Sequence, residues 1–274
     1  MRGHLLVDVP LIAAAVSLYP TCGLAPVGWL AAASAIIHGW AVVSPRSSLY
    51  MPVWWRVPGS RDCALTYDDG PNPEVTPRLL DLLAGSDQRA TFFVIGSHVR
   101  RHPHLVRRMV AEGHAVGLHS DTHSRWFNCW LPGRIQRDLD ACGKAIADAA
   151  GIPSPRLFRP PVGLKNPMVG FVCGRMGLRA ITWTARARDT GSPAVEVVLA
   201  RIAGALRPGG ICVMHDGHEP GRDGVRASCL ESTPLAIARL TSLGLRSGPL
   251  RATADGVAIG GSDASAEMVQ PLAR

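Results

Sequence analysis

The chain has 274 residues and a formal net charge of +8, with 29 Lys and Arg against 21 Asp and Glu. This length allows one large α/β domain or two small ones with a short extension, and the positive charge suits anionic partners in general. Nucleic acid is not expected as a partner, because the sequence has no nucleic-acid-binding motif, and seven single cysteines exclude a regular disulfide framework.

Residues 5–43 are the most apolar part of the chain, and Asp8 is the one formally charged side chain among them. The run from residue 21 to residue 43 has about the length of a membrane-spanning helix, whereas 5–19 is short for a span. The sequence therefore predicts that residues 1–60 form a membrane-associated segment with one or two helices. A cleaved signal peptide is the alternative.

The side of the membrane that carries the rest of the chain stays open. A single span suggests an outside domain, whereas Arg46, Arg56 and Arg61 after the last apolar run suggest the cytoplasmic side. The unpaired cysteines favour the reducing inside. We therefore predict association with the inner or plasma membrane without choosing a side.

From Asp62 onward, short apolar runs alternate with amphipathic stretches, which is typical of repeated strand-helix units. The predicted strands are 63–67, 90–95, 115–118, 157–158, 178–183 and 211–214. The predicted helices are 76–85, 104–112, 134–149, 167–176 and 233–242, with another beginning at Ser192 and Pro193. After about residue 250 the chain becomes rich in Gly, Ala and Ser, so 251–274 is predicted to be a flexible tail.

The most suggestive polar residues follow the predicted strands directly. In a parallel barrel the loops at the carboxyl ends of the strands converge on one face, so residues far apart in sequence share one site there. Seven side chains are placed in this way, namely Asp68, Asp69, His119, His123, Arg159, Asp189 and His215.

A metal site is indicated by H-S-D-T-H at 119–123, where we expect His119 and His123 to lie on one face of a helical turn. Imidazole with carboxylate is a ligand set typical of catalytic zinc and related ions. The spacing alone is weak, since His98 and His102 share it by chance. The same residues could otherwise be ordinary polar side chains at a strand end.

Two adjacent carboxylates, Asp68 and Asp69, stand in T-Y-D-D-G at 66–70. A turn is the ordinary interpretation, because D-D-G-P favours turns. Two adjacent carboxylates repel and gain little from a turn, however. Beside a cation, one can bind the ion and the other can take a proton from water.

Four segments resemble the motifs of NodB-type polysaccharide deacetylases, carbohydrate esterase family four: T-Y-D-D-G, H-S-D-T-H, R-P-P-V-G at 159–163 and V-M-H-D at 213–216. The similarity covers roughly residues 61–245 and implies a catalytic domain at 61–250. It also implies an α/β fold, a distorted (β/α) barrel of about seven strands. The implied enzyme is a hydrolase that removes N-acetyl groups from an amino-sugar glycan or glycolipid with a bound divalent metal.

The resemblance also implies roles for the first group of residues. Asp68 would be the general base, with Arg159 orienting it. The ligands of the ion, zinc or one similar to cobalt, would be Asp69, His119 and His123.

The remaining roles fall on His215 in V-M-H-D and on two segments, around Val162 and Asp189, that depart from the family pattern. By resemblance His215 would protonate the leaving amine, held by Asp189, and the backbone N–H of Val162 would stabilise the oxyanion. Family members usually have Tyr where this chain has Val162, and an Asp and a Trp where it has Arg186 and Thr190. With Arg188 nearby, Arg186 would make this wall cationic, so we hypothesise a substrate with phosphate or carboxylate, such as a lipid-linked sugar.

Two rival functions stay open. One is a deformylase or deacetylase of a polyprenyl-linked sugar, which the membrane segment favours. The other is a non-catalytic carbohydrate-binding membrane protein, although binding alone would not need a base at Asp68 and an acid at His215.

Overall fold

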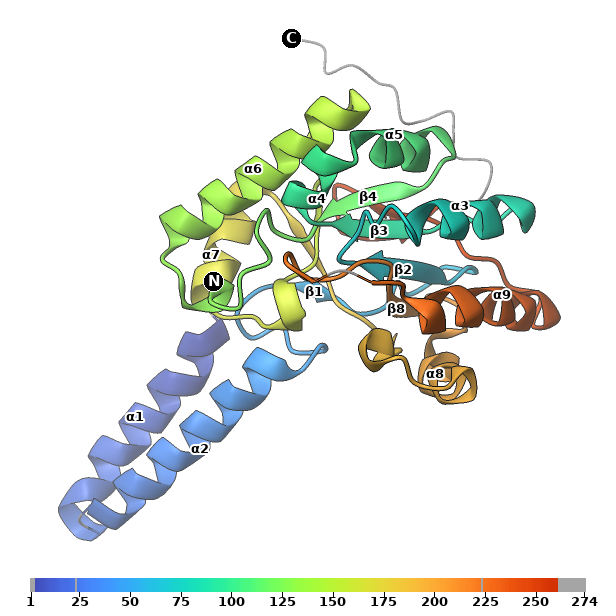
Figure 1. The fold of residues 1–274 in the computed structure, drawn as a ribbon. Helices are drawn as coiled ribbons and strands as arrows, with labels where there is room; N and C mark the ends of the chain where they lie inside the picture. The colour runs from blue at the N-terminus through green and yellow to red at the C-terminus, as the bar shows by residue number, and fades with distance from the viewer. Residues whose placement is uncertain (1–2, 23, 223, 261–274) are drawn as a thin grey trace.

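The computed structural model describes residues 3–22, 24–222 and 224–260. Its main sheet has eight strands in the order β1-β6-β5-β4-β3-β2-β8-β7, and the strands that pair in it are parallel. The strands are β1 (Val53–Trp54), β2 (Ala64–Asp68), β3 (Thr91–Val94), β4 (Ala115–Leu118), β5 (Leu157–Phe158), β6 (Arg179–Ile181), β7 (Ala185–Arg186) and β8 (Ile211–His215). Helices cover the outside of the curled sheet (Figure 1).

The covering helices follow the strands in alternation, as the sequence predicted. They are α3 (Thr76–Gly85), α4 (Gly96–Arg101), α5 (Pro103–Ala111), α6 (Pro132–Ala150), α7 (Pro167–Met176), α8 (Val195–Ile202) and α9 (Ala227–Ser242). Every residue of β2, β3 and β8 is buried, because the side chains on both faces of a parallel strand are covered. The predicted α/β barrel is confirmed.

The predicted strand 178–183 corresponds to β6, and a further short strand, β7, follows it that the sequence did not predict. β6 pairs with β5 and β1, whereas β7 pairs with β8 at the other edge of the sheet. Between them the Thr182 N–H donates to the Trp54 carbonyl at 3.0 Å, and the Thr184 N–H donates to the Ile211 carbonyl at 2.9 Å. With β1 and β7, neither of which was predicted, the sheet has eight strands where about seven were expected.

Two helix starts differ from the prediction. Helix α9 begins at Ala227 instead of Thr233 and carries Pro234 inside it, because Cys229 and Leu230 in the earlier turns are buried in the core. Helix α8 begins at Val195 instead of Ser192, whose φ of 49° is left-handed and cannot start a helix.

The N-terminal segment is a hairpin of α1 (Gly3–Cys22) and α2 (Leu24–Val43) that projects away from the barrel, with both outer ends at the barrel (Figure 1). By length and composition, α2 is long and apolar enough to cross a membrane, and α1 contains a shorter apolar helix at 6–19. On α2 the large apolar side chains of Leu24, Trp29 and Ile36 are more than two-thirds exposed. A core helix of a soluble domain would bury them.

The described part of the predicted tail is ordered as a hairpin. Strands β9 (Leu250–Ala252) and β10 (Val257–Ile259) pair antiparallel, and Leu250 is buried against the barrel. The rest of the predicted tail, 261–274, lies outside the described residues.

Candidate active site

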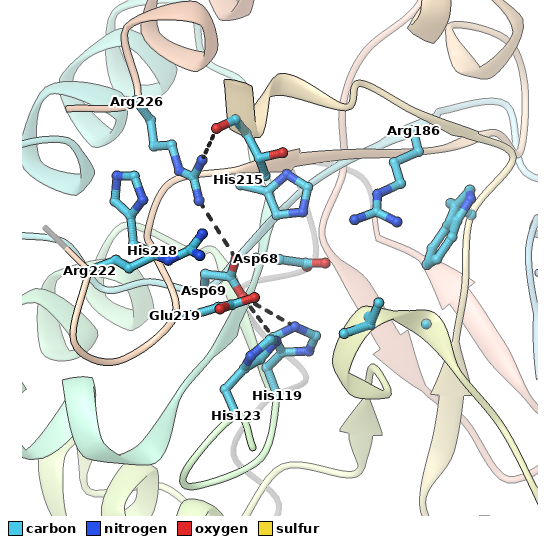
Figure 2. A pocket seen from close by; sticks show the side chains of 14 residues that line it. Asp68, Asp69, His119, His123, Arg186, His215, His218, Glu219, Arg222 and Arg226 are labelled. Carbon is cyan, nitrogen blue, oxygen red and sulfur yellow. Dashed lines mark hydrogen bonds and ion pairs between the residues drawn. The ribbon is translucent and has the colours of Figure 1, made fainter. Parts of the chain in front are cut away.

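One pocket of about 200 Å³ opens at the carboxyl ends of the strands. The loop placement expected from the sequence brings together six of the predicted residues in its lining: Asp68, Asp69, His119, His123, Val162 and His215. Figure 2 shows the carboxyl and imidazole side chains of this set converging on the pocket from the ends of three strands and the segments that follow them. Arg159 and Asp189 lie behind the pocket and reach it through Asp68 and His215.

Asp68 is the last residue of β2, and its carboxylate is fixed by a buried arginine. Arg159 Nη1 donates to Asp68 Oδ1 at 2.6 Å and to Thr66 Oγ1 at 2.7 Å. The guanidinium is fully buried over the ring of Phe93, and its Nη2 donates to the carbonyl of Thr182. This charge-assisted contact sets the rotamer of Asp68 and leaves its Oδ2 as the oxygen that can act in the pocket.

Asp69, His119 and His123 form the one cluster of metal-ligand type found among the described residues, with one ligand atom from each within 4.8 Å of the others. Both Nε2 atoms lie 3.4 Å from Asp69 Oδ1. All three side chains are buried, yet Asp69 Oδ1 has no hydrogen-bond partner in the described chain. A buried orphan carboxylate oxygen facing two imidazoles fits a divalent cation.

The orientation of His119 suits the same interpretation. Its Nδ1 lies 2.8 Å from the carbonyl of Arg159, so Nδ1 carries the proton and Nε2 presents a lone pair toward Asp69. Metal-binding histidines are commonly held by such a hydrogen bond on the opposite ring nitrogen. When the imidazoles are protonated instead, burial still acts to raise the pKa of Asp69, but the hydrogen bond and charge of His119 and the charges of His215 and His123 outweigh it and lower that pKa.

Residues 119–123 do not form the predicted helical turn, but His119 and His123 lie close together, as that turn would have placed them. The segment is an irregular loop in which Ser120 and His123 have left-handed φ values of 74° and 46°. The Ser120 hydroxyl accepts hydrogen bonds from the backbone N–H groups of Thr122 and His123. Serine makes such turns in competition with helix, and the turn carries His123 back beside His119.

His215, the last residue of β8, is held by Asp189 in two places. Asp189 Oδ1 lies 2.6 Å from His215 Nδ1, and Oδ2 accepts from the His215 backbone N–H at 2.9 Å. Burial acts to lower the pKa of His215, but the hydrogen bond to Asp189 and the charges of Asp189 and Asp69 outweigh it and raise that pKa. The imidazole is therefore suited to hold and deliver a proton at Nε2.

Val162 occupies an unfavourable backbone conformation at the pocket wall. Its φ is 58° and ψ is 0°, and its side chain is 50% exposed. A β-branched residue in the left-handed region is an outlier, and such strain clusters at functional sites. Gly163 follows with φ +77°, and a Cβ there would meet the Trp183 ring at 2.2 Å.

Three arginines line the pocket, and they are not the pair that the sequence suggested. Arg186 lies with its guanidinium 5.4 Å from the Trp183 ring, and its buried Nε has no hydrogen-bond partner among the residues that the structure describes. Arg188 is exposed and outside the pocket lining, so its predicted place in the wall is wrong. Arg222 and Arg226, from the loop after β8, complete the cationic set.

Arg226 is the residue that the sequence interpretation missed. It is buried, donates from Nε to the Gly217 carbonyl at 2.6 Å, and brings Nη2 to 4.0 Å from Asp69 Oδ2. Figure 2 shows Asp69 between Arg226 and the two imidazoles of His119 and His123. Its position in the loop after a strand could have suggested Arg226 as a site residue, but Arg226 belongs to none of the four family motifs.

Comparison with known proteins agrees with this geometry. The model for the family described as polysaccharide deacetylase matches residues 56–181. A chitooligosaccharide deacetylase from Bradyrhizobium sp. (strain ANU 289) is 40% identical over 177 residues, which are 65% of this chain and 79% of the relative. The chain belongs to the polysaccharide deacetylase family.

Solved structures of the family have the same fold. The family 4 carbohydrate esterase from Streptomyces lividans, solved in complex with acetate, matches with a TM-score of 0.64 and 29% identity over 74% of this chain and 98% of that one. A wild-type family 4 pseudoenzyme from Bacillus anthracis also matches with a TM-score of 0.64, at 26% identity, over 72% of this chain and 67% of that one. The polysaccharide deacetylase fold alone therefore does not decide turnover, and the site residues must.

Proposed function

We propose that this polysaccharide deacetylase is a metal-dependent N-deacetylase of an amino-sugar glycan or glycolipid. The observation that carries the proposal is the buried Asp69 carboxylate, which faces His119 and His123 beside a second carboxylate, Asp68, that a buried arginine orients. A divalent ion, most simply zinc, held by those three ligands would polarise the amide and acidify a bound water.

The protein residues divide the proton transfers. Asp68 accepts the proton of the attacking water, because Arg159 pairs with its carboxylate and holds it in place. His215 Nε2 gives a proton to the departing amine, and Asp189 stabilises the imidazolium until it does so. The backbone N–H of Val162 donates to the oxygen on which negative charge develops.

The direct test combines metal analysis of the purified chain with acetate release from N-acetylated glycans that include chitooligosaccharides. We expect wild type to bind about one divalent ion and to release acetate. His119→Ala should lose both the metal and the activity, whereas Asp68→Asn should keep the metal and lose about 10²-fold or more in kcat. Full activity in either variant would contradict the proposed roles.

A lipid-linked amino sugar is a second candidate substrate, and the cationic pocket favours it. Arg186 and Arg222 line the wall together with Arg226, which lies beside Asp69, so an anionic group such as phosphate would be attracted next to the ion site. Product analysis distinguishes the deacetylase from a deformylase on such a substrate, because one releases acetate and the other formate.

A non-catalytic role is less well supported. A binding protein has no need for the buried pair of His215 and Asp189, in which His215 Nδ1 lies 2.6 Å from Asp189 Oδ1. The other imidazole nitrogen, Nε2, is available to the pocket. Absence of product from the metal-loaded wild-type chain, with glycan binding retained, would establish the non-catalytic role instead.

A further inference from the structure

The face of the barrel that carries the pocket is also the face where the N-terminal hairpin attaches. The Val42 carbonyl at the end of α2 accepts from the Lys165 backbone N–H at 3.2 Å, and the Ser44 carbonyl accepts from Lys165 Nζ at 2.6 Å. The Pro45 carbonyl accepts from Thr182 Oγ1, also at 2.6 Å. Lys165 and Thr182 lie in the loops that follow β5 and β6 at their carboxyl ends.

A polar cluster within the hairpin strengthens this attachment. His38 Nε2 on α2 lies 2.8 Å from Asp8 Oδ1 on α1, and its Nδ1 lies 2.6 Å from the hydroxyl of Tyr50. Tyr50 is buried, and its backbone carbonyl packs so closely against Gly170 of α7 that a Cβ on that glycine would meet it at 2.4 Å. Both helices are therefore fastened to the barrel near its catalytic loops.

The loop after β4 continues this face. Residues 124–131, hereafter the mouth segment, are joined to the loop of Lys165 by the Asn166 side-chain amide, which donates to the Asn128 carbonyl. Trp126 is 71% exposed and Leu131 is 72% exposed, and no described large apolar side chain outside the hairpin is more exposed. Two aromatic side chains in the same segment, Phe127 and Trp130, are buried. Of the large apolar side chains in the segment, Trp126 and Leu131 are therefore the exposed ones.

Basic side chains flank these exposed apolar residues. Arg125 stands directly before Trp126 with its side chain 72% exposed. Arg134 follows Leu131 and lies over the Trp130 ring at 4.0 Å from its centroid. Exposed Trp and Leu between arginines are typical of a segment that lies at the interface of an anionic membrane.

We propose that the mouth segment rests on the surface of an anionic bilayer, with Trp126 and Leu131 inserted at the headgroup level, so that the catalytic pocket opens beside the lipid. The occupant is lipid and not another protein, because this surface is continuous with the helix whose length and composition suit a membrane span. An isolated exposed patch would carry no such assignment. The pocket would then meet substrates presented in the membrane plane.

The full chain can be tested in vesicles of phosphatidylcholine with a minority of phosphatidylglycerol. A nitroxide label is placed on Trp126→Cys after replacing Cys22 and the exposed Cys129 with Ser; the other five cysteines are buried. The matched control is Val197→Cys on α8, where the native side chain is 42% exposed; Figure 1 shows α8 beside α9 and apart from the hairpin. Relaxation by oxygen, which partitions into lipid, is compared with relaxation by a water-soluble nickel complex.

We expect the ratio of oxygen to nickel relaxation to be several-fold higher at position 126 than at position 197. Equal ratios would overturn the proposal, and so would a label at 126 that is immobilised yet shielded from both reagents, which would assign the surface to a protein partner. A second measurement uses unlabelled protein: brominated phosphatidylcholine should quench a smaller share of tryptophan fluorescence in Trp126→Phe than in wild type. Neither readout depends on turnover, so both stand apart from the proposed deacetylase activity.

Discussion

The pair of His215 and Asp189 sets the pH at which the proposed acid can work. His215 must carry a proton to give it to the amine, so activity falls as pH rises through the pKa of this imidazole. Asp189 raises that pKa against the effect of burial. Asp189→Asn should therefore move the alkaline limb of the kcat profile to lower pH by about one pH unit or more.

The measurement is kcat against pH for the metal-loaded wild type and variant on one soluble chitooligosaccharide. Asp81→Asn is a suitable control, because Asp81 pairs with Arg108 on the outside of the barrel. An alkaline limb unchanged in Asp189→Asn would exclude His215 as the titrating acid.

Arg186 is the residue expected to select the charge of the substrate. Arg186→Ala should lower kcat/KM about tenfold or more on anionic N-acetylated substrates, because a charge-assisted contact in a partly buried site is lost, and should leave neutral chitooligosaccharides nearly unchanged. Arg188→Ala is the matched control, since Arg188 lies outside the pocket. Equal effects of Arg186→Ala on both substrate classes would contradict a role in charge selection.

The sequence predicted which residues lie at the site better than it predicted the contacts that their side chains make. Asp68, His119 and His215 were recognisable because each follows a predicted strand, and strand ends of a parallel barrel share one face. The salt bridge between Arg159 and Asp68 came from family resemblance. Arg226 was not predictable, because its approach to Asp69 depends on the path of an irregular loop.

Among the short elements, the 3₁₀ turn at Pro161–Gly163 stores strain that a substitution should release. Val162→Gly removes the Cβ from a left-handed conformation, which costs roughly 1–2 kcal/mol for an L-residue, against roughly 0.5–1 kcal/mol of added backbone entropy. We expect a net rise in the free energy of unfolding of about 0.5–1 kcal/mol. Urea unfolding measures it.

The same variant tests which part of Val162 acts. Val162→Gly keeps the backbone N–H, so kcat on a small soluble substrate should stay within a few-fold of wild type. A large loss of kcat together with raised stability would mean that the side chain, and not the N–H, serves the reaction.

The link between α2 and the barrel depends on Lys165. Burial lowers the pKa of this amine to about 8, so between about pH 8 and the ordinary lysine pKa of about 10.4 the unfolded chain binds more protons than the folded one. The contribution of Lys165 to the free energy of unfolding therefore increases as pH rises through that window. Lys165→Met removes this dependence and the Nζ hydrogen bond to the Ser44 carbonyl, which keeps the Ser47 N–H as a donor.

We expect faster hydrogen exchange at residues 40–46 in Lys165→Met, because the end of α2 loses a fastening contact. Lys144→Met is the matched control, since Lys144 is exposed and pairs with Asp148 on the surface of α6. Equal exchange in wild type and Lys165→Met would show that the remaining contacts of the hairpin with the barrel, and not the Lys165 amine, hold the end of α2.

Element boundaries were predictable where apolar periodicity is strong and not where tertiary pairing decides. The range of helix α3 was predicted correctly from its leucine stripe, although Val75 and Ser86 cap it and not Thr76 and Gly85. Strand β7 was not predicted, because the chain switches partners from β5 to β8 within a few residues and without any change in local composition. The helical turn predicted at His119 was wrong, because the Ser120 hydroxyl accepts a hydrogen bond from the His123 backbone N–H and holds the chain in a local turn.

For the whole molecule, the shape of the hairpin constrains how the chain sits in a membrane. Each helix has 20 residues and thus a length of about 30 Å at 1.5 Å per residue, which matches the hydrocarbon core. Helix α1 alone is a poor span, but its Asp8 pairs with His38 instead of facing lipid. Both helices are expected to cross together, so residue 3 and the barrel lie on one side.

The positions of the basic residues indicate on which side of the membrane the barrel lies. Arg46 and Arg56 come after α2, and their guanidinium groups lie over the Trp55 ring at 4.9 and 5.1 Å from its centroid, whereas the connection between the helices, 20–24, carries no charge. Lysine and arginine accumulate in cytoplasmic loops, so we expect the barrel on the cytoplasmic face. This placement agrees with six described cysteines, all of which are free.

The topology is tested by labelling intact cells with a membrane-impermeant maleimide. Cysteines are placed singly at Gly3 and at Leu24 in a background with Cys22 and Cys129 replaced by Ser, and native Cys129 reports on the barrel because it is exposed. Leu24→Cys should react in intact cells, whereas Gly3→Cys and Cys129 should react only after permeabilisation. If Gly3→Cys and Cys129 reacted on opposite sides, only one helix would span the membrane. If all three cysteines reacted from outside, the hairpin would not cross the bilayer. Its exposed apolar surface would then have to be covered at the outer face.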